Sequence, residues 1–289
     1  MFLLRDGFHG PLLIIGGAED KEGDCLILRR LIELSGGTGA KVAVITAATD
    51  EPAAAGREYV EVFRDLGARR VTVLDIPDRS AADLPSLAAG LLDATAVFFT
   101  GGDQLRITSC AGGTLFDRTI WDLHCRGTLI AGTSAGASVM SDTMIVAGDS
   151  DDAPKKCTTK MAPGLGLLKE VVIDQHFAQR GRVGRLLSAL AQNPRVIGVG
   201  LDEDTAILVG NDLRFTVLGS QTVTVLDGSA IQYTNASESN PDDPLALSQV
   251  VMHILPSDYG YDLLGRQVLV PTSSRMMGVL HGTEEYQSF

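Results

Sequence analysis

Short apolar segments alternate with stretches of helical spacing through the first half of the chain, and this alternation most constrains the fold. Such a pattern predicts βαβ units, which build a mostly parallel sheet with helices on both faces. The predicted strands are 11–15, 41–46, 71–75, 96–100 and 128–131, and the predicted helices are 25–34, 52–66, 81–92 and 114–125. Ligands of these sheets bind beyond the carboxyl ends of the strands, so functional residues are expected there.

The second half of the chain changes character and becomes rich in predicted strands. After a strand at 171–174 and a helix at 177–191, the pattern favours a strand pair at 196–202 and 205–209 and a hairpin within 213–226. No linker or internal repeat separates a second domain. We therefore expect one catalytic α/β domain over 1–289, with a hairpin-rich part from about 196 onward packed on it.

Charge and composition exclude several functional classes. The net charge of −12 and the isoelectric point near 4.8 argue against a general binder of nucleic acid or of anionic membranes. No apolar run approaches a membrane span of about 20 residues, and no secretory signal is visible. The four cysteines are far apart and lack metal-ligand spacing, so reduced thiols in a cytoplasmic protein are expected.

The segment Gly132-Thr133-Ser134-Ala135-Gly136 has the pattern of a nucleophile elbow. It follows an apolar strand and precedes residues consistent with a helix, and its small residues suit a strained turn that exposes a serine. The amide of Ala135 would point to where an oxyanion forms. Ser134 is therefore the candidate nucleophile, although a small-residue turn without chemistry has the same pattern.

A serine nucleophile needs a base and an orienting acid. Among the five histidines, only His176 follows a predicted strand and has polar neighbours, so it is the candidate base. The polar loop between Ser134 and His176 supplies three candidate acids, and periodicity does not choose among them: Asp149, Asp151 and Asp152.

Other polar residues cluster near the expected site. The Gly101-Gly102 turn ends a strand, so the amide of Gly102 could complete an oxyanion hole, with Gln104 pointing into the same crevice. Three arginines follow His176 and could bind substrate carboxylates, although they could also form an exposed helix face: Arg180, Arg182 and Arg185.

Several long motifs resemble those of the cyanophycinase family, within the clan that also holds peptidase E. The motifs span residues 13 to about 235 and are LIIGGAEDK at 13–21, TGGDQLR at 100–106, AGTSAGA at 131–137, VIDQHF at 172–177, the three arginines and DEDTA at 202–206.

The resemblance implies a serine exopeptidase that cleaves cyanophycin, a polymer of aspartate with arginine on each β-carboxyl, into β-Asp-Arg dipeptides. It also implies a flavodoxin-like fold akin to class I glutamine amidotransferases with a C-terminal β-rich extension, a homodimer, and no metal or cofactor. Ser134 matches the nucleophile and His176 the base. Asp152 falls where the family's acid is expected, two residues before Pro154, and Asp149 is the alternative.

The resemblance further implies a substrate pocket lined by polar and charged residues. These are Gln104, Asp174, Gln175, Arg180, Arg182, Arg185 and Glu203. Arginines would meet substrate carboxylates, and Asp174 or Glu203 would meet the substrate guanidinium. Two alternatives remain: a peptidase for other β-aspartyl or N-terminal aspartyl peptides, and a non-catalytic binding relative of the same fold.

Overall fold

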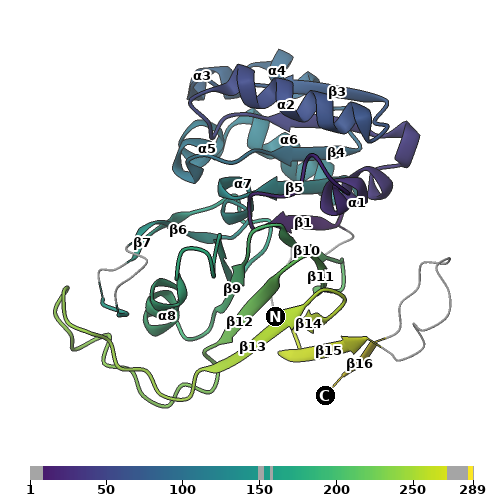
Figure 1. Cartoon of the computed structure of the whole chain (residues 1–289). Coiled ribbons are helices and arrows are strands. Elements are labelled where there is room, and N and C mark those ends of the chain that lie inside the picture. Colours follow the sequence, from purple (N-terminus) through teal and green to yellow (C-terminus); the bar gives the residue numbers. More distant parts are fainter. Residues whose placement is uncertain (1–8, 149–152, 157–158, 272–285, 289) are drawn as a thin grey trace.

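The computed structural model describes residues 9–148, 153–156, 159–271 and 286–288. Its upper half in Figure 1 is built on five parallel strands in the order β1-β5-β4-β2-β3. These strands are β1 (Leu12–Ile15), β2 (Lys41–Ile45), β3 (Arg70–Leu74), β4 (Ala96–Phe99) and β5 (Leu129–Thr133). The predicted α/β fold class is therefore confirmed.

Helices cover both faces of this parallel sheet. They are α1 (Leu26–Leu34), the 3₁₀ turn η1 (Gly37–Gly39), α2 (Pro52–Asp65), α3 (Arg79–Ala82), α4 (Pro85–Ala89), α5 (Gln104–Ala111) and α6 (Leu115–Cys125). Successive residues of a strand point to opposite faces. Leu13 of β1 accordingly packs with buried residues of α1 and α2, whereas Leu12 belongs to the core formed with α5 and α6.

Two expected helices differ from the structure. The helix expected at 81–92 is broken into α3 and α4, because Pro85 disfavours a helical conformation at Leu84 and removes an amide donor. The helix expected at 177–191 is α8 (Val183–Gln192), which begins later because residues 177–182 form turns.

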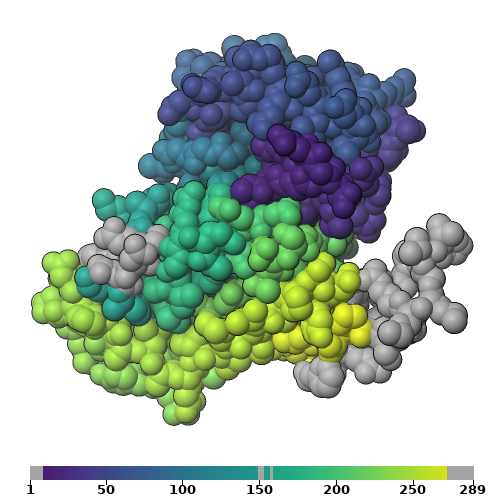
Figure 2. Space-filling model, in the orientation of Figure 1, coloured from purple at the N-terminus to yellow at the C-terminus, as the bar shows by residue number. Residues whose placement is uncertain are grey.

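Antiparallel strands extend the same sheet beyond β1. They are β10 (Thr205–Val209), β11 (Arg214–Gly219), β14 (Gly260–Asp262), β15 (Gln267–Pro271) and β16 (Tyr286–Ser288). Together with the parallel strands they make a ten-stranded sheet. In Figure 2 the yellow-green and yellow residues toward the C-terminal end form the lower part of the molecule.

A second, four-stranded sheet lies beside the first and carries part of the site. Its order is β13-β12-β9-β8, with β8 (Val171–Gln175), β9 (Ile197–Leu201), β12 (Thr222–Asp227) and β13 (Val251–Pro256). The strands β6 (Thr143–Gly148) and β7 (Thr159–Pro163) form a separate pair, and the short helix α7 (Ala135–Ser138) follows β5.

The expected pairings at 196–209 and 213–226 are wrong, because the chain crosses between the two sheets in both places. Strand β9 pairs with β8 and β12, whereas β10 pairs with β1 and β11. Likewise β11 and β12 lie in different sheets. The first crossing, at 202–204, lies where the carboxyl ends of β8 and β9 meet. In the described part of the chain, no helix is long and apolar enough to cross a membrane.

Candidate active site

Ser134 lies on a tight turn between β5 and α7. Its backbone has φ 54° and ψ −111°, a strained conformation for a residue with a side chain, and its amide donates to the carbonyl of Ile15 over 3.0 Å. A Cβ at Gly132 would lie 2.3 Å from the carbonyl oxygen of Gly136, and one at Gly136 would lie 2.4 Å from that of Phe99. The turn is thus the strand-to-helix elbow that the G-x-S-x-G pattern predicts.

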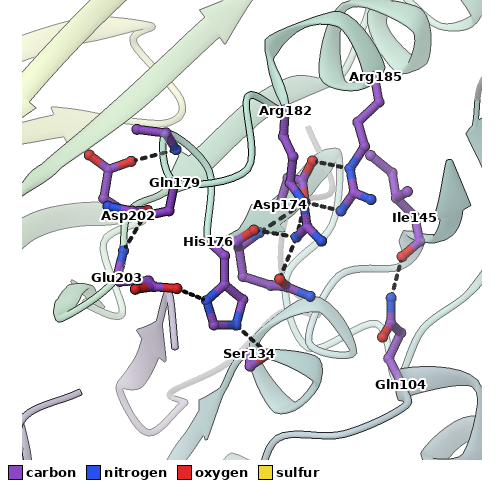
Figure 3. Close-up of polar contacts among 12 residues, drawn as sticks. Gln104, Ser134, Ile145, Asp174, His176, Gln179, Arg182, Arg185, Asp202 and Glu203 are labelled. Carbon is purple, nitrogen blue, oxygen red and sulfur yellow. Dashed lines mark hydrogen bonds and ion pairs between the residues drawn. The ribbon is translucent and has the colours of Figure 1, made fainter. Parts of the chain in front are cut away.

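His176 faces the serine from the end of β8. Its Nε2 lies 2.9 Å from the Oγ of Ser134, as Figure 3 shows. The amide of His176 donates to the carbonyl of Gly16 over 2.9 Å. The ring lies so close to Gly17 that a Cβ there would be 2.4 Å from its Cε1. A glycine at position 17 is therefore needed to leave room for the imidazole.

The other ring nitrogen of His176 contacts Glu203. The distance from Nδ1 to Oε1 is 2.7 Å. Strands β8 and β9 run parallel with Gln175 opposite Leu201, so the residues after the two strands meet at one edge. Two further bonds hold this loop, since the Glu203 amide donates to Gln179 and the Thr205 hydroxyl donates to the Glu203 carbonyl.

In the described structure, the carboxylate against His176 is thus Glu203, for which the family resemblance implies a role in substrate binding. The acid expected there, Asp152, and its alternatives Asp149 and Asp151 lie outside the described residues. The sequence does contain a signal for Glu203. Three acids, 202–204, directly follow the apolar strand β9, and β9 is the parallel neighbour of the strand that ends at His176.

Burial keeps His176 neutral near pH 7. Burial lowers the pKa of His176 below its ordinary value of 6.5, the hydrogen bond to Glu203 opposes this effect, and the positive charge of Arg180 adds to it. A neutral imidazole can accept the proton of a serine hydroxyl, and the facing carboxylate stabilises the imidazolium that results. Serine, histidine and glutamate are therefore arranged for nucleophilic catalysis.

The glycine turn after β4 lies against the serine. A Cβ at Gly101 would be 3.4 Å from the Cβ of Ser134, and Gly102 has φ 139°. A Cβ at Gly102 would be 2.1 Å from the carbonyl oxygen of Ala48, so no side chain fits there. Gly101 thus lies against Ser134, and the two expected oxyanion residues, Gly102 and Ala135, directly follow Gly101 and Ser134 in the chain.

The predicted pocket arginines divide into two groups. Arg180 is exposed, whereas Arg182 and Arg185 are buried and form ion pairs with Asp174, whose side chain is 0% exposed. Arg185 contacts both carboxylate oxygens, and Arg182 also donates to the carbonyl and the side-chain oxygen of Gln175. Asp174 is therefore committed to internal arginines and is not placed to meet a substrate guanidinium.

This buried cluster carries excess positive charge. Two guanidinium groups face one carboxylate, and burial lowers the pKa of Arg182 to about 10, which leaves it charged at neutral pH. Within the part of the chain that the structure describes, the Nε of Arg182 is buried without a hydrogen-bond partner. Gln104 is also buried, and its amide nitrogen donates to the carbonyl of Ile145 in β6 over 2.6 Å.

The sequence profile of peptidase family S51 matches residues 12–217, which include every residue of this site. The chain belongs to peptidase family S51. Within the family, a cyanophycinase of Geminocystis herdmanii is 42% identical over 253 residues, covering 87% of this chain and 93% of the relative. A cyanophycinase of Synechococcus elongatus is 38% identical over 268 residues, covering 91% of this chain and 82% of the relative.

Solved structures of this fold are more distant in sequence. A peptidase from an acI-B1 actinobacterium has a TM-score of 0.58 at 23% identity, covering 86% of this S51 chain and 99% of its own. A putative peptidase E of Listeria monocytogenes has a TM-score of 0.54 at 16% identity, covering 74% of this chain and 100% of its own. At these identities the likeness supports the fold. Across the described residues, no cluster of three or more histidine, cysteine or acidic side chains is arranged to hold a metal ion.

Proposed function

We propose that this chain is a cyanophycinase, a serine exopeptidase that hydrolyses cyanophycin to β-Asp-Arg dipeptides through an acyl-enzyme on Ser134. The main support is the pair of hydrogen bonds that His176 makes with Ser134 and Glu203, in a chain that is 38–42% identical to cyanophycinases. An intact serine, histidine and carboxylate relay also argues against a non-catalytic relative.

The proposed reaction uses the two ring nitrogens of His176 in different ways. Nδ1 holds its proton toward Glu203, so Nε2 is free to accept the proton of Ser134 as Oγ attacks the peptide carbonyl. The amides of Ala135 and Gly102 would stabilise the resulting oxyanion. His176 then protonates the leaving amine, the peptide bond breaks, and water hydrolyses the ester with His176 again as base.

Substrate recognition would rest on the charges beside His176. β-Asp-Arg units carry carboxylates, and we infer that the exposed Arg180 binds them, with the buried Arg182 adding positive charge beside it. Arg185 would orient Asp174, and Asp174 would hold Arg182 in place. Gln104 and Gln175 would form the polar wall of the pocket. The side chain of Glu203 is 38% exposed, so its outer face could also meet the substrate guanidinium.

Incubation with cyanophycin followed by mass spectrometry of the products tests this function. The wild-type enzyme should release β-Asp-Arg dipeptides progressively from one chain end, and Ser134→Ala should release none. The fold shared with a putative peptidase E favours one second candidate, a peptidase for α-linked aspartyl peptides. Cleavage of α-linked aspartyl peptides at a kcat/KM comparable to that for cyanophycin would favour that candidate instead.

We also propose that 1–289 act as one catalytic domain and that the enzyme is a cytoplasmic homodimer. The site combines residues from both sheets, which supports a single domain. Strand β13 ends the four-stranded sheet and exposes Met252 (47%) and Ile254 (62%) on one face, an apolar surface that a second copy could cover. The three cysteines among the described residues are free, as a reducing compartment requires. Light scattering would test the dimer.

A further inference from the structure

Glu19 is a buried carboxylate that takes no part in the proposed relay. It lies in the loop after β1, and the residue is only 5% exposed. Each of its oxygens accepts a hydrogen bond from a hydroxyl: Tyr59 of α2 donates to Oε1 over 2.6 Å, and Thr133 at the end of β5 donates to Oε2. A buried charge held by two hydroxyls is costly unless both bonds are kept, so this arrangement fixes the three side chains relative to one another.

The Thr133 bond reaches the serine elbow directly. Thr133 is the last residue of β5, and Ser134 follows it in the strained turn conformation. Two hydrogen bonds therefore hold the elbow. The Ser134 amide donates to the carbonyl of Ile15, and the hydroxyl of the preceding residue, Thr133, donates to Glu19.

The same loop holds the other members of the relay through its backbone. The carbonyl of Gly16 accepts from the His176 amide over 2.9 Å, and the carbonyl of Gly17 accepts from the amide of Asp204, the neighbour of Glu203, over 2.9 Å. One short loop, 16–19, thus contacts Thr133, His176 and Asp204. A fixed loop therefore sets the position of the serine relative to its base.

The raised pKa of Tyr59 agrees with its role as a hydroxyl donor to the Glu19 carboxylate. Burial and then the negative charge of Glu19 raise the pKa of Tyr59 well above its ordinary value of 10. Tyr59 therefore keeps its proton and donates it to Glu19 at all working pH values. Tyr59 serves as the control because it binds the same carboxylate from α2, whereas Thr133 directly precedes Ser134 in the chain.

We propose that Glu19 is a positioning residue for Ser134, acting through Thr133. The inference rests on the proposed function, since it takes Ser134 as the nucleophile. Misplacement of a reacting group by about 1 Å can cost on the order of 10²-fold in rate. Loss of the Thr133 bond should therefore lower the reactivity of Ser134, while substrate affinity is kept.

Two isosteric variants form the matched test. Thr133→Val and Tyr59→Phe each remove one hydroxyl from the same carboxylate, so each leaves one Glu19 oxygen without its donor. We expect Thr133→Val to lower kcat and the rate of fluorophosphonate labelling by about 10- to 100-fold with little change in KM. Tyr59→Phe should lose comparable stability but keep most of its kcat, and Thr133→Ser, which restores the hydroxyl, should restore activity.

Equal losses of kcat in Thr133→Val and Tyr59→Phe would overturn the inference, as would no rescue by Thr133→Ser. If Thr133→Val does not fold, Thr133→Ala serves in its place with the same expectation, because the elbow accepts small residues. Fluorophosphonate labelling separates this result from a failure of the proposed function. A wild-type enzyme that labels on Ser134 but does not cleave cyanophycin refutes the substrate, whereas normal labelling of Thr133→Val refutes the role of Glu19.

Discussion

Replacement of Glu203 by glutamine tests which acid serves His176. The substitution keeps the size and hydrogen-bonding capacity of the side chain but removes its charge. In the structure the carboxylate lies 2.7 Å from Nδ1 of His176, close enough to fix the tautomer and to stabilise the imidazolium. The amide can present its nitrogen to Nδ1 and favour the wrong tautomer, and it offers no negative charge to the protonated ring.

The geometry sets the size of the expected effect. Loss of the orienting carboxylate in a buried serine protease triad lowers kcat by about 10⁴-fold. The Glu203 side chain is 38% exposed, so solvent shares in stabilising the imidazolium and a smaller loss is expected. We predict a fall in kcat of about 10³-fold for Glu203→Gln, with a much smaller rise in KM, because the main contact of the acid is with His176 and only its outer face is open to the substrate guanidinium.

Steady-state release of β-Asp-Arg from cyanophycin measures both constants, and Asp152→Asn and Asp149→Asn are the matched variants. Under the Glu203 account they should retain most of the wild-type kcat. A damaging Asp152→Asn beside a mild Glu203→Gln would refute the reasoning and restore the acid expected from the sequence. A large rise in KM with normal kcat for Glu203→Gln would instead assign Glu203 to substrate binding.

Two further predictions follow from the histidines. Burial is the main cause that lowers the pKa of His176, and the positive charge of Arg180 adds to it. Arg180→Ala should therefore raise this pKa, so that the rate of fluorophosphonate labelling begins to fall at a higher pH on the acid side of its pH profile. An unchanged pH profile would contradict this. Burial also lowers the pKa of His124 from 6.5 to about 4, so the unfolded chain binds the proton first as the pH falls through this window. Protonation of His124 in the unfolded chain should therefore lower the free energy of unfolding by about 2 kcal/mol between pH 7 and pH 5. In urea denaturation, the free energy of unfolding of His124→Phe should fall by about 2 kcal/mol less over the same pH range.

The parallel half of the fold can be predicted from patterns of apolar and polar residues within short segments. Strands β1, β2, β4 and β5 are almost fully buried, so their sequences are largely apolar runs, and the residue that follows each strand is small or polar. The elbow is also local, because its steric demands fall on the neighbours of Ser134 itself. In such segments sequence and structure agree because the causes lie within a few residues.

The acid and the arginines depend on pairing between distant segments. Glu203 meets His176 only because β9 pairs with β8, and the two residues are 27 positions apart. Apolar runs at 196–202 and 205–209 also suit a hairpin, and only the sheet crossing at 202–204 brings Glu203 to the site. Arg182 and Arg185 point inward to Asp174, whereas Arg180 is exposed. The residues around them in the sequence do not predict this difference.

The central claim is that Ser134 is a nucleophile activated by His176 and Glu203. Its most direct test is labelling with a small fluorophosphonate at neutral pH, followed by mass spectrometry of the intact protein and of its peptides. The account predicts one adduct per chain, located on Ser134, formed far more slowly in Glu203→Gln and absent in Ser134→Ala. An adduct on another residue, or labelling of Ser134→Ala at the wild-type rate, would contradict it.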